Sequence, residues 1–366
     1  MRILQLCSAR EIGGGEKHLA GLANSLVERG HQIFAAINPG SPLRATLSSV
    51  PSPNVIELPM RNALSLRSAY RLSRFMREHR IEIIHAHLAR DYPLAALAAG
   101  RSKARLVLTR HVLFPLSKIH RLTLRRTSRV IAVSQAVADS LRAQNIFSTE
   151  RILTIHNGID SEHFKQRRAA ASREQGSRMR VGMVGHLAPI KGQEEFIQAA
   201  RLICQSRKDV DFIIAGEDKS YRRENRASLE RLIRALGLED RVQLLGWIDD
   251  VASLLGTLDV FVSPARAEPF GLAIVEAMAA GVPVVSTASE GAREIITADE
   301  SGRLVSIGDV EGLAKAIADL LSDANARDRL SHNASALARD RFSMDKMVGR
   351  TEQVYREVNA ESAELS

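Results

Sequence analysis

The apolar residues of this chain fall in short runs that alternate with longer amphipathic stretches. Runs of four to six residues rich in Val, Ile and Leu predict strands that are buried on both faces of a sheet. The stretches between them are closed by Gly or Pro and predict helices. In the first half the predicted strands are 2–7, 32–37, 81–85, 106–109, 130–133 and 152–155, and the predicted helices are 16–29, 66–79, 91–99 and 135–144.

This alternation breaks once and then resumes. Residues 164–179 are polar and nearly free of large apolar side chains, so we predict a linker there. Repeated strand–helix pairs predict parallel, doubly wound sheets with helices on both faces. We therefore expect two Rossmann-like α/β domains, 1–163 and 180–343, and a last segment, 344–366. The second series has predicted strands at 180–184, 210–215, 242–245, 260–262 and 282–286, and predicted helices at 314–321, 324–342 and 344–360.

Length and composition agree with this division. A chain of 366 residues is long enough for two domains, and 45% hydrophobic with 25% charged residues is usual for a globular protein. No apolar run reaches the roughly 18 residues of a membrane span, and the first residues do not resemble a signal peptide. Cys7 and Cys204 are far apart, which favours a reducing compartment without disulfides. We expect a cytoplasmic protein.

The net charge of +9 is concentrated in one region. Between Tyr92 and Ala138 the chain has nine Lys and Arg residues and no Asp or Glu. Residues 116–129 interleave apolar with basic positions, which predicts a basic amphipathic helix. That helix would either be an ordinary surface helix or contact an anionic membrane surface or an acceptor. We predict no nucleic-acid partner, because nucleic-acid fold motifs are absent and aromatic residues are scarce.

Loops that follow the strands are the expected place for a ligand. Open parallel sheets bind ligands beyond the carboxyl ends of their strands, and two such edges facing each other would form a cleft. Loop 11–17 includes Gly14 and Gly15 at the start of a helix, which suits a phosphate neighbour, although a purely structural Gly turn is the alternative. The loop lacks G-x-G-x-x-G, and the second strand ends at Asn38-Pro39 without an acidic residue for the ribose, which argues against a nicotinamide cofactor.

Histidines follow two of the first-domain strands. His85 and His87 fall on one face of the strand. The sequence shows no third metal-binding residue that would complete a site with them, so we predict no metal site. His111 follows strand 106–109 and would face the cleft, where it could transfer a proton or hold a hydroxyl. A structural role is the alternative for His111.

The stretch 259–294 carries the strongest chemical pattern of the second domain. Glu268 lies in a loop after a strand, and Glu276 lies on the following helix, with the N–H groups of Phe270, Gly271 and Leu272 between them. A helix N-terminus attracts phosphate, and carboxylates accept hydrogen bonds from sugar hydroxyls. An exposed loop Glu and an ordinary helix Glu are the alternative reading. Further residues expected along the same cleft are His186, Lys191 as a point charge for phosphate, and Glu217.

These motifs together resemble glycosyltransferase family 4, whose members are retaining enzymes of the GT-B fold. The resemblance covers nearly the whole chain. It is strongest in Glu-Pro-Phe-Gly-Leu at 268–272, followed by Glu-Ala-Met-Ala-Ala-Gly-Val-Pro-Val-Val at 276–285. Other matching motifs are Gly-Gly-x-Glu at 13–16, His-Asn-Gly-Ile-Asp at 156–160, Gly185 with Lys191-Gly192, and Gly216-Glu217.

The resemblance implies a role for each matching residue. Glu276 should bind the ribose of a nucleotide sugar, and Glu268 should contact the transferred sugar beside the backbone of Phe270, Gly271 and Leu272. Lys191 should meet the diphosphate, Gly14 and Gly15 should close on the donor, and His111 should lie near the sugar and the leaving group. The family usually needs no metal and no further cofactor, and its last helix usually returns to the first domain.

One departure from the family pattern concerns charge at the diphosphate. The family commonly has Arg where His186 stands, and His is largely neutral near pH 7. The implied activity is transfer of a hexosyl unit, with retention, from a UDP-sugar or GDP-sugar to a lipid, lipopolysaccharide or other glycan acceptor at the cytoplasmic membrane face. A nucleotide-sugar epimerase of the same fold and an inactive membrane-associated partner protein are the alternatives.

Overall fold

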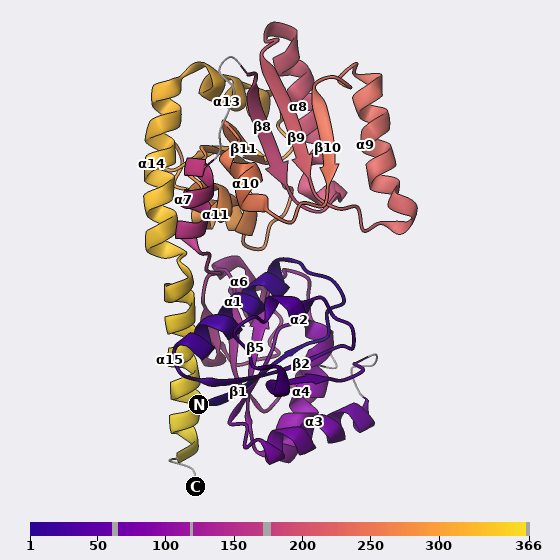
Figure 1. Cartoon of the computed structure of the whole chain (residues 1–366), viewed down its shortest axis with the longest axis vertical. Coiled ribbons are helices and arrows are strands. Elements are labelled where there is room, and N and C mark those ends of the chain that lie inside the picture. The colour runs from indigo at the N-terminus through magenta and orange to yellow at the C-terminus, as the bar shows by residue number, and fades with distance from the viewer. Residues whose placement is uncertain (61–64, 118–119, 171–176, 364–366) are drawn as a thin grey trace. The chain divides into compact units, whose positions relative to one another are not determined.

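The chain forms two compact units, each built on one parallel sheet. The computed structural model describes residues 1–60, 65–117, 120–170 and 177–363. Unit 1 comprises Met1–Gly158 together with the residues from Met344 onward, and unit 2 comprises Ile159–Ser343. All strand pairs are parallel (Figure 1), so the predicted class of two doubly wound Rossmann-like sheets is confirmed.

The sheet of unit 1 has seven strands in the order β3-β2-β1-β4-β5-β6-β7. Its central strands are largely apolar and almost completely buried, as strands covered on both faces must be. β1 and β2 pair in register from Arg2 with Gln32 to Cys7 with Ile37. The strands are β1 (Arg2–Cys7), β2 (Gln32–Ile37), β3 (Val55–Glu57), β4 (Ile83–Ala86), β5 (Arg105–Arg110), β6 (Thr127–Ala132) and β7 (Ile152–Thr154).

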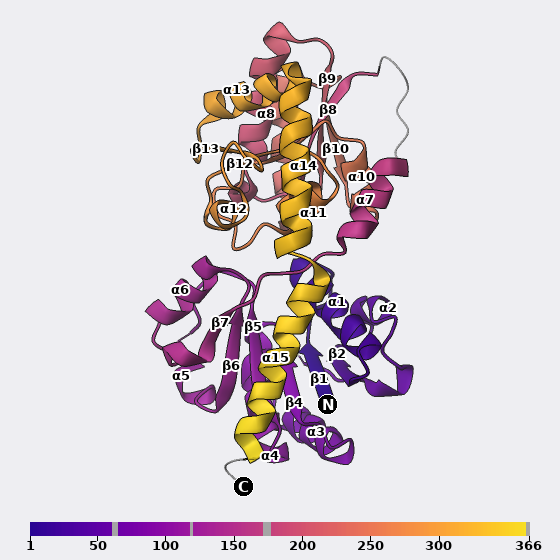
Figure 2. The ribbon, with the colours of Figure 1, turned by 90° about the vertical axis from the view of Figure 1, so that its left-hand side faces the viewer.

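Helices cover both faces of this sheet. Right-handed crossovers place α1 (Gly14–Glu28), which moves the chain from β1 to β2, on the face opposite α3 (Leu66–Glu78), α4 (Tyr92–Ser102) and α6 (Gln135–Ala143). The last helix, α15 (Met344–Ala363), packs against α1 and β6 (Figure 2). Tyr355 and Val348 of α15 are completely buried in the same apolar cluster as Leu19 and Leu22 of α1, so α15 completes the core of unit 1.

The sheet of unit 2 has six strands in the order β10-β9-β8-β11-β12-β13. β8 and β11 are neighbours, and the chain leaves them in opposite directions across the sheet. A doubly wound sheet has its topological switch point between two such strands. The strands are β8 (Met179–Val184), β9 (Val210–Ala215), β10 (Val242–Gly246), β11 (Val260–Ser263), β12 (Val284–Thr287) and β13 (Arg303–Val305).

Two groups of helices enclose the second sheet. α8 (Gln193–Ser206) and α13 (Val310–Ser322) contact each other and share one apolar core, whereas α11 (Leu272–Ala279) contacts α14 (Ala324–Arg341). α7 (Ser161–Ala170) also packs on α11, in agreement with the position of both helices beside α14 in Figure 1. The remaining helices of unit 2 are α9 (Glu224–Ala235), α10 (Val251–Gly256) and α12 (Glu290–Ile295).

The predicted amphipathic helix at 116–129 is wrong. Among the described residues of this segment, the structure has the single turn α5 (His120–Thr123), and residues from Thr127 onward belong to β6, where they pair with β5 and β7. Leu124 is buried while Leu122 is 74% exposed, so the apolar positions do not form one face. Lys118 and Ile119 lie outside the described residues. The sheet overrides the helical spacing, and contact of this segment with a membrane surface stays a prediction.

The polar segment 164–179 is not a simple linker. Its first part, 164–170, belongs to α7, in which Phe164 is buried and Arg168 donates from one guanidinium nitrogen to the carbonyl oxygens of Gly256 (3.0 Å) and Leu258 (2.6 Å). Residues 171–176 lie outside the described part, and β8 starts at Met179. The charged residues of α7 therefore give the segment the composition of a linker, although Arg168 is bound to backbone carbonyl oxygens.

Among the described helices, none is long and apolar enough to cross a membrane.

Candidate active site

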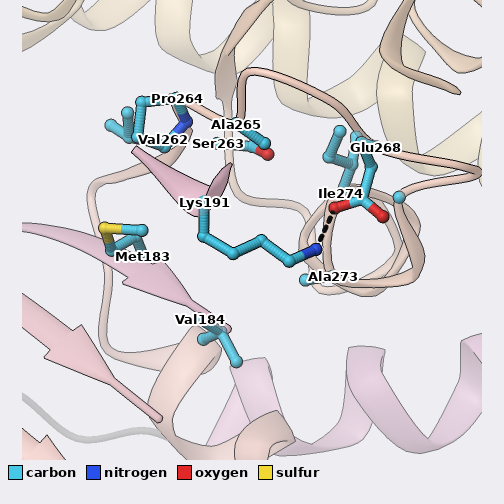
Figure 3. A pocket seen from close by; sticks show the side chains of 11 residues that line it. Met183, Val184, Lys191, Val262, Ser263, Pro264, Ala265, Glu268, Ala273 and Ile274 are labelled. Atoms are coloured by element: carbon cyan, nitrogen blue, oxygen red, sulfur yellow. Dashed lines mark hydrogen bonds and ion pairs between the residues drawn. The ribbon is translucent and has the colours of Figure 1, made fainter. Parts of the chain in front are cut away.

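A small pocket lies in unit 2 at the carboxyl ends of β8 and β11, at the topological switch point of the sheet (Figure 3). It has about 280 Å³ of empty space including its open mouth, which suits part of a nucleotide sugar rather than the whole. Three predicted residues, Lys191, Glu268 and Gly271, line it. The other lining residues are Met183, Val184, Val262, Ser263, Pro264, Ala265, Ala273 and Ile274.

Lys191 and Glu268 form an ion pair across this pocket. Nζ of Lys191 lies 2.6 Å from Oε2 of Glu268, with the two side chains 27% and 16% exposed (Figure 3). The residues are far apart in sequence, and each comes from a loop after a strand. An ammonium group has three N–H donors, so the contact with Glu268 leaves two directions in which Lys191 can meet phosphate oxygens.

A tight turn fixes Lys191 at the pocket. The turn η4 (Pro189–Lys191) ends at Gly192, whose φ of +75° is readily adopted only by glycine. A Cβ at Gly192 would lie 2.1 Å from the carbonyl oxygen of Pro264, so the two pocket loops touch backbone to backbone. The N–H of Arg266 donates to the carbonyl oxygen of Ile190 (2.9 Å) and ties the same loops together. Lys191 is therefore held by backbone packing.

Gly192→Ala is expected to lower the free energy of unfolding of unit 2 by at least about 2 kcal/mol, because the new Cβ adds a backbone clash to left-handed strain. Gly308→Ala is the matched control. Gly308 has a φ of +80° with nothing within 4 Å of its Cβ position. Gly308→Ala should therefore lower the free energy of unfolding only by the backbone strain of about 1 kcal/mol. Denaturant unfolding of both variants measures the difference, and equal losses would contradict the close approach to Pro264.

The helix N-terminus beside the pocket begins at Gly271. Its φ is +104°, and a Cβ there would lie 3.0 Å from Cδ1 of Ile274. The N–H groups of Ile274 and Val275 both donate to the carbonyl oxygen of Gly271, at 3.0 and 3.2 Å. Helix geometry leaves the N–H groups of the first turn, those of Leu272 and Ala273, without an acceptor inside the helix. Leu272 and Ala273 are half-exposed, so this end of α11 can bind an anion.

Two residues that were predicted to bind the nucleotide sugar lie deeper in the fold. Glu276 is 7% exposed and lies one turn into α11, outside the lining of the pocket. Phe270 is buried, and its ring meets Phe342 edge-on with the centroids 5.7 Å apart. The Phe270 ring therefore anchors the loop to the end of α14. Of this residue, the backbone alone can contact a ligand.

His186 and Glu217 lie on neighbouring loops, after β8 and β9. The N–H of Leu187 donates to the carbonyl oxygen of Glu217 (3.0 Å), and Nε2 of Gln193 donates to that of His186 (2.8 Å). Both His186 and Glu217 are half-exposed, and neither lines the pocket. The structure thus brings Lys191, Glu268 and Gly271 together in one pocket, and Glu276, His186 and Glu217 are not part of its lining.

The predicted residues of unit 1 gather at the start of α1. Gly14 is exposed as the first residue of the helix, and Gly15 lies against the ring of His111, since a Cβ on Gly15 would be 3.4 Å from Cδ2 of that ring. Nε2 of His111 is buried and has no hydrogen-bond partner among the described residues. Glu16 caps the helix by accepting from the N–H of Gly13 (2.9 Å).

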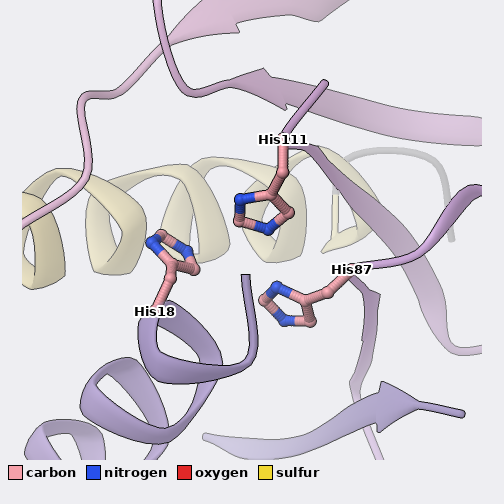
Figure 4. Close-up of side chains that lie close together, drawn as sticks. All are labelled: His18, His87 and His111. Atoms are coloured by element: carbon pink, nitrogen blue, oxygen red, sulfur yellow. The ribbon is translucent and has the colours of Figure 1, made fainter. Parts of the chain in front are cut away.

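Two further histidines surround His111. His18 of α1 and His87 after β4 are buried, and their rings lie 5.0 and 5.9 Å from that of His111, centroid to centroid (Figure 4). Burial lowers the pKa of His18 to about 4. Burial, followed by repulsion from neighbouring imidazoles, holds the pKa values of His87 and His111 well below the usual range. All three rings are therefore neutral at pH 7.

The sequence missed this arrangement because its members come from three separate segments. His85 and His87 do share a face, with centroids 4.2 Å apart, but His85 contacts Tyr355 and Thr109 instead of joining the other rings. The sequence showed no third ligand to go with His85 and His87, whereas the structure places His18 and His111 beside His87. The order of strands β1, β4 and β5 in the sheet was the available signal, because it puts the loops after them side by side.

Comparison with known proteins identifies the family. Residues 12–163 match the family described as Glycosyltransferase Family 4, and residues 164–336 match Glycosyl transferases group 1. Together the two matches cover both units and include every predicted site residue. The chain belongs to glycosyltransferase family 4, and its fold is GT-B.

Relatives share about a quarter of the sequence. The phosphatidylinositol N-acetylglucosaminyltransferase GPI3 subunit of Saccharomyces cerevisiae is 25% identical over 73% of this chain, which spans only 63% of the length of that protein. The N-acetyl-alpha-D-glucosaminyl L-malate synthase of Bacillus anthracis is 26% identical over 95% of this chain and 94% of its own length. The crystal structure of Anabaena HepE with UDP and glucose has a TM-score of 0.83 and 26% identity, covering 96% of this chain and 98% of the other.

Proposed function

We propose that this protein is a retaining glycosyltransferase that moves a hexosyl unit from a UDP-sugar to a hydroxyl group of a lipid-linked or glycan acceptor. The observation that carries the proposal is the pocket at the switch point of unit 2, where Lys191 and Glu268 meet beside the N-terminus of α11. A cation and a helix N-terminus suit a diphosphate, and a carboxylate suits sugar hydroxyls. Membership of glycosyltransferase family 4 supports the reaction class.

The donor assignment draws on relatives. Anabaena HepE has been crystallised with UDP and glucose, and both curated relatives are named for N-acetylglucosaminyl transfer. UDP-N-acetylglucosamine and UDP-glucose are therefore the donors that we favour, with GDP-sugars next. We assign the diphosphate to Lys191, His186 and the backbone of 270–272, the ribose to Glu276, and the remaining donor contacts to Glu217, Gly14 and Gly15.

The proposed chemistry is a front-face displacement. The bond between the anomeric carbon and the diphosphate breaks, and the acceptor oxygen bonds to the same carbon on the same face. The leaving phosphate takes the proton of the acceptor hydroxyl, while Lys191 and the N–H groups at the start of α11 stabilise its growing charge. Glu268 and His111 contact the transferred sugar. These groups provide the stabilisation without a metal ion at the diphosphate.

A transfer assay tests the proposal. The chain is incubated with each nucleotide sugar and with phosphatidylinositol or L-malate, the acceptors suggested by the names of the two relatives. We expect release of free nucleotide to depend on the acceptor, and nuclear magnetic resonance of the product to show the anomeric configuration of the donor. An epimer formed from the donor alone would favour a nucleotide-sugar epimerase instead, and inverted product would contradict retention. For an acceptor in a membrane, we place the reaction at the cytoplasmic face.

Glu268→Gln should keep nucleotide binding but slow transfer by at least about tenfold. The amide preserves the shape and a hydrogen-bond acceptor for Lys191 but removes the negative charge beside the reacting sugar. Calorimetric titration with UDP and a turnover assay at saturating donor measure the two effects separately. Unchanged turnover would exclude a catalytic role for the Glu268 carboxylate, and lost UDP binding would point to a structural one.

A further inference from the structure

A pocket of unit 1 lies at the carboxyl ends of three neighbouring strands, β1, β2 and β3. It has about 630 Å³ of empty space including its open mouth, more than twice that of the pocket at Lys191. Volumes between about 300 and 1,000 Å³ are usual for small-molecule sites. This Arg10 pocket is lined by Arg10 after β1, by Asn38, Pro39, Gly40 and Ser41 after β2, and by Pro59 after β3.

Two buried side chains of the lining tie the three loops together. The amide nitrogen of Asn38 donates to the carbonyl oxygen of Ser8, and the amide oxygen of Asn38 accepts from the N–H of Met60 (2.9 Å). Oγ of Ser41 donates to the carbonyl oxygen of Ala9 (2.8 Å). These bonds hold the loops after β1, β2 and β3 against one another, so the Arg10 pocket does not need a ligand in order to form.

A tight turn leaves one side of this pocket open. The N–H of Ser41 donates to the carbonyl oxygen of Asn38 (3.1 Å), which closes a turn with Pro39 and Gly40 at its centre. Gly40 has a φ of +69°, which glycine adopts readily at this position of a turn. Nothing lies within 4 Å of the Cβ position at Gly40, so there is room for a ligand beside the turn.

Arg10 gives the pocket a positive charge. It is exposed, and its side chain makes no hydrogen bond or ion pair with the part of the chain that the structure describes. No carboxylate belongs to the described lining: Glu11 lies outside it, and Asp91 accepts from the N–H of Ser8 (2.8 Å). A guanidinium group matches the geometry of carboxylate and phosphate, which it can bind through two parallel hydrogen bonds. The Arg10 pocket therefore suits an anionic group.

The position of the pocket in the sheet sets the length of its ligand. Four of the six lining residues follow β2, whereas His111, which we assign to the transferred sugar, follows β5. The strand order β2-β1-β4-β5 separates the two places by three strand spacings. This separation is about 14 Å. A molecule that fills the pocket and also presents a hydroxyl beside His111 must be longer than one hexose unit.

We propose that the Arg10 pocket binds a carboxylate or phosphate group of an extended glycan or glycolipid acceptor, whose reacting hydroxyl lies beside His111. Arg10 pairs with the anionic group, and the open side of the Gly40 turn admits the sugar ring that carries it. The inference rests on the proposed function, because it concerns the remote end of the same acceptor. It argues against L-malate as the acceptor, since its carboxylates lie next to its hydroxyl and it is too short to reach both places.

Titration of the isotope-labelled full chain with small anions tests the pocket without donor or turnover. The backbone amide signals of Gly40 and Ser41 in nuclear magnetic resonance report on this pocket alone, so an anion beside Lys191 does not interfere. Inorganic phosphate and D-glucuronate are the probes for the two kinds of anion, and methyl glucoside is the uncharged control. We expect saturable shifts with at least one anion and none with methyl glucoside. No saturable shift with either anion would overturn the proposal.

Variants of Arg10 locate the charge that binds the anion. Arg10→Ala should weaken the binding by about tenfold or more, as loss of a hydrogen-bonded charge does, and Arg10→Glu should abolish it. Arg71→Ala, at an exposed position of α3, is the matched control and should bind like the original chain. Equal binding in Arg10→Ala, or an equal loss in Arg71→Ala, would contradict the role of Arg10.

Acceptor kinetics separate this inference from the proposed function. The acceptors are a trisaccharide that ends in glucuronate and the same trisaccharide with glucose in that place. Arg10→Ala should raise KM for the charged acceptor by about tenfold or more and leave KM for the nucleotide sugar and for the uncharged acceptor unchanged. An equal rise for both acceptors would overturn the inference. Failure of the original chain to transfer from any donor would instead refute the proposed function, and the anion titration would still decide whether the pocket binds an anion.

Discussion

Replacing Lys191 by alanine is expected to lower the turnover of glycosyl transfer by about 10²-fold or more, as loss of a charge-stabilising donor commonly does. Lys191 supplies the ammonium group at the pocket, and its turn is fixed by the contact of Gly192 with Pro264. The diphosphate gains negative charge as it leaves, so a cation held in place beforehand acts most strongly in the transition state. Turnover at saturating donor, measured by nucleotide release, gives the size of the effect.

Lys315→Ala is the control for loss of a lysine from the same unit. Lys315 lies on α13 with its side chain 78% exposed, where it pairs with Asp319 at 3.0 Å, and its loss should leave turnover unchanged. Unfolding curves for both variants separate chemistry from stability. A folded Lys191→Ala chain with nearly unchanged turnover would remove Lys191 from the mechanism, and the charge would then have to come from the α11 N-terminus and His186.

Tyr355→Ala is expected to destabilise unit 1 by about 3–5 kcal/mol, the usual cost of removing a fully buried aromatic side chain. Tyr355 is completely buried on α15 in the apolar cluster that includes α1. Its hydroxyl also lies 2.6 Å from Nδ1 of His85. Hydrogen exchange of the β4 amides reports the stability of unit 1 without interference from unit 2.

Two further tyrosine variants separate the contributions. Tyr355→Phe keeps the ring and removes only the hydroxyl, so we expect a smaller loss of about 1–3 kcal/mol from the unpaired His85. Tyr70→Ala, on α3 with 57% of the residue exposed, should change stability by less than about 0.5 kcal/mol. Full protection of β4 in Tyr355→Ala would mean that α15 contributes little to unit 1.

Most strands could be predicted from the sequence, including the edge strands β7 and β10. Residues 2–7 and 210–215 are largely apolar runs, and the structure has strands with the same bounds. β3 and β13 were missed because each has three residues, is only partly buried and lies at a sheet edge. A short edge strand leaves no continuous apolar run in the sequence.

The site was partly predictable for a similar reason. Glu268 and Gly271 stand in one motif after a strand, so their placement at the sheet edge followed from local pattern. The contact of Glu268 with Lys191 depends on β8 and β11 being neighbours, which no single segment reveals. The same is true of His18, His87 and His111, because only the strand order brings their segments together.

The return of the chain to unit 1 has a consequence for biosynthesis. Residues up to Gly158 leave the ribosome well before α15 has been made, so the apolar surface of α1 that packs against Tyr355 and Val358 is uncovered during most of translation. Unit 2 is continuous in sequence and has all of its residues available earlier than unit 1. The half of the protein that is synthesised first is therefore the half that completes its core last, and in the meantime it is exposed to aggregation and to chaperones.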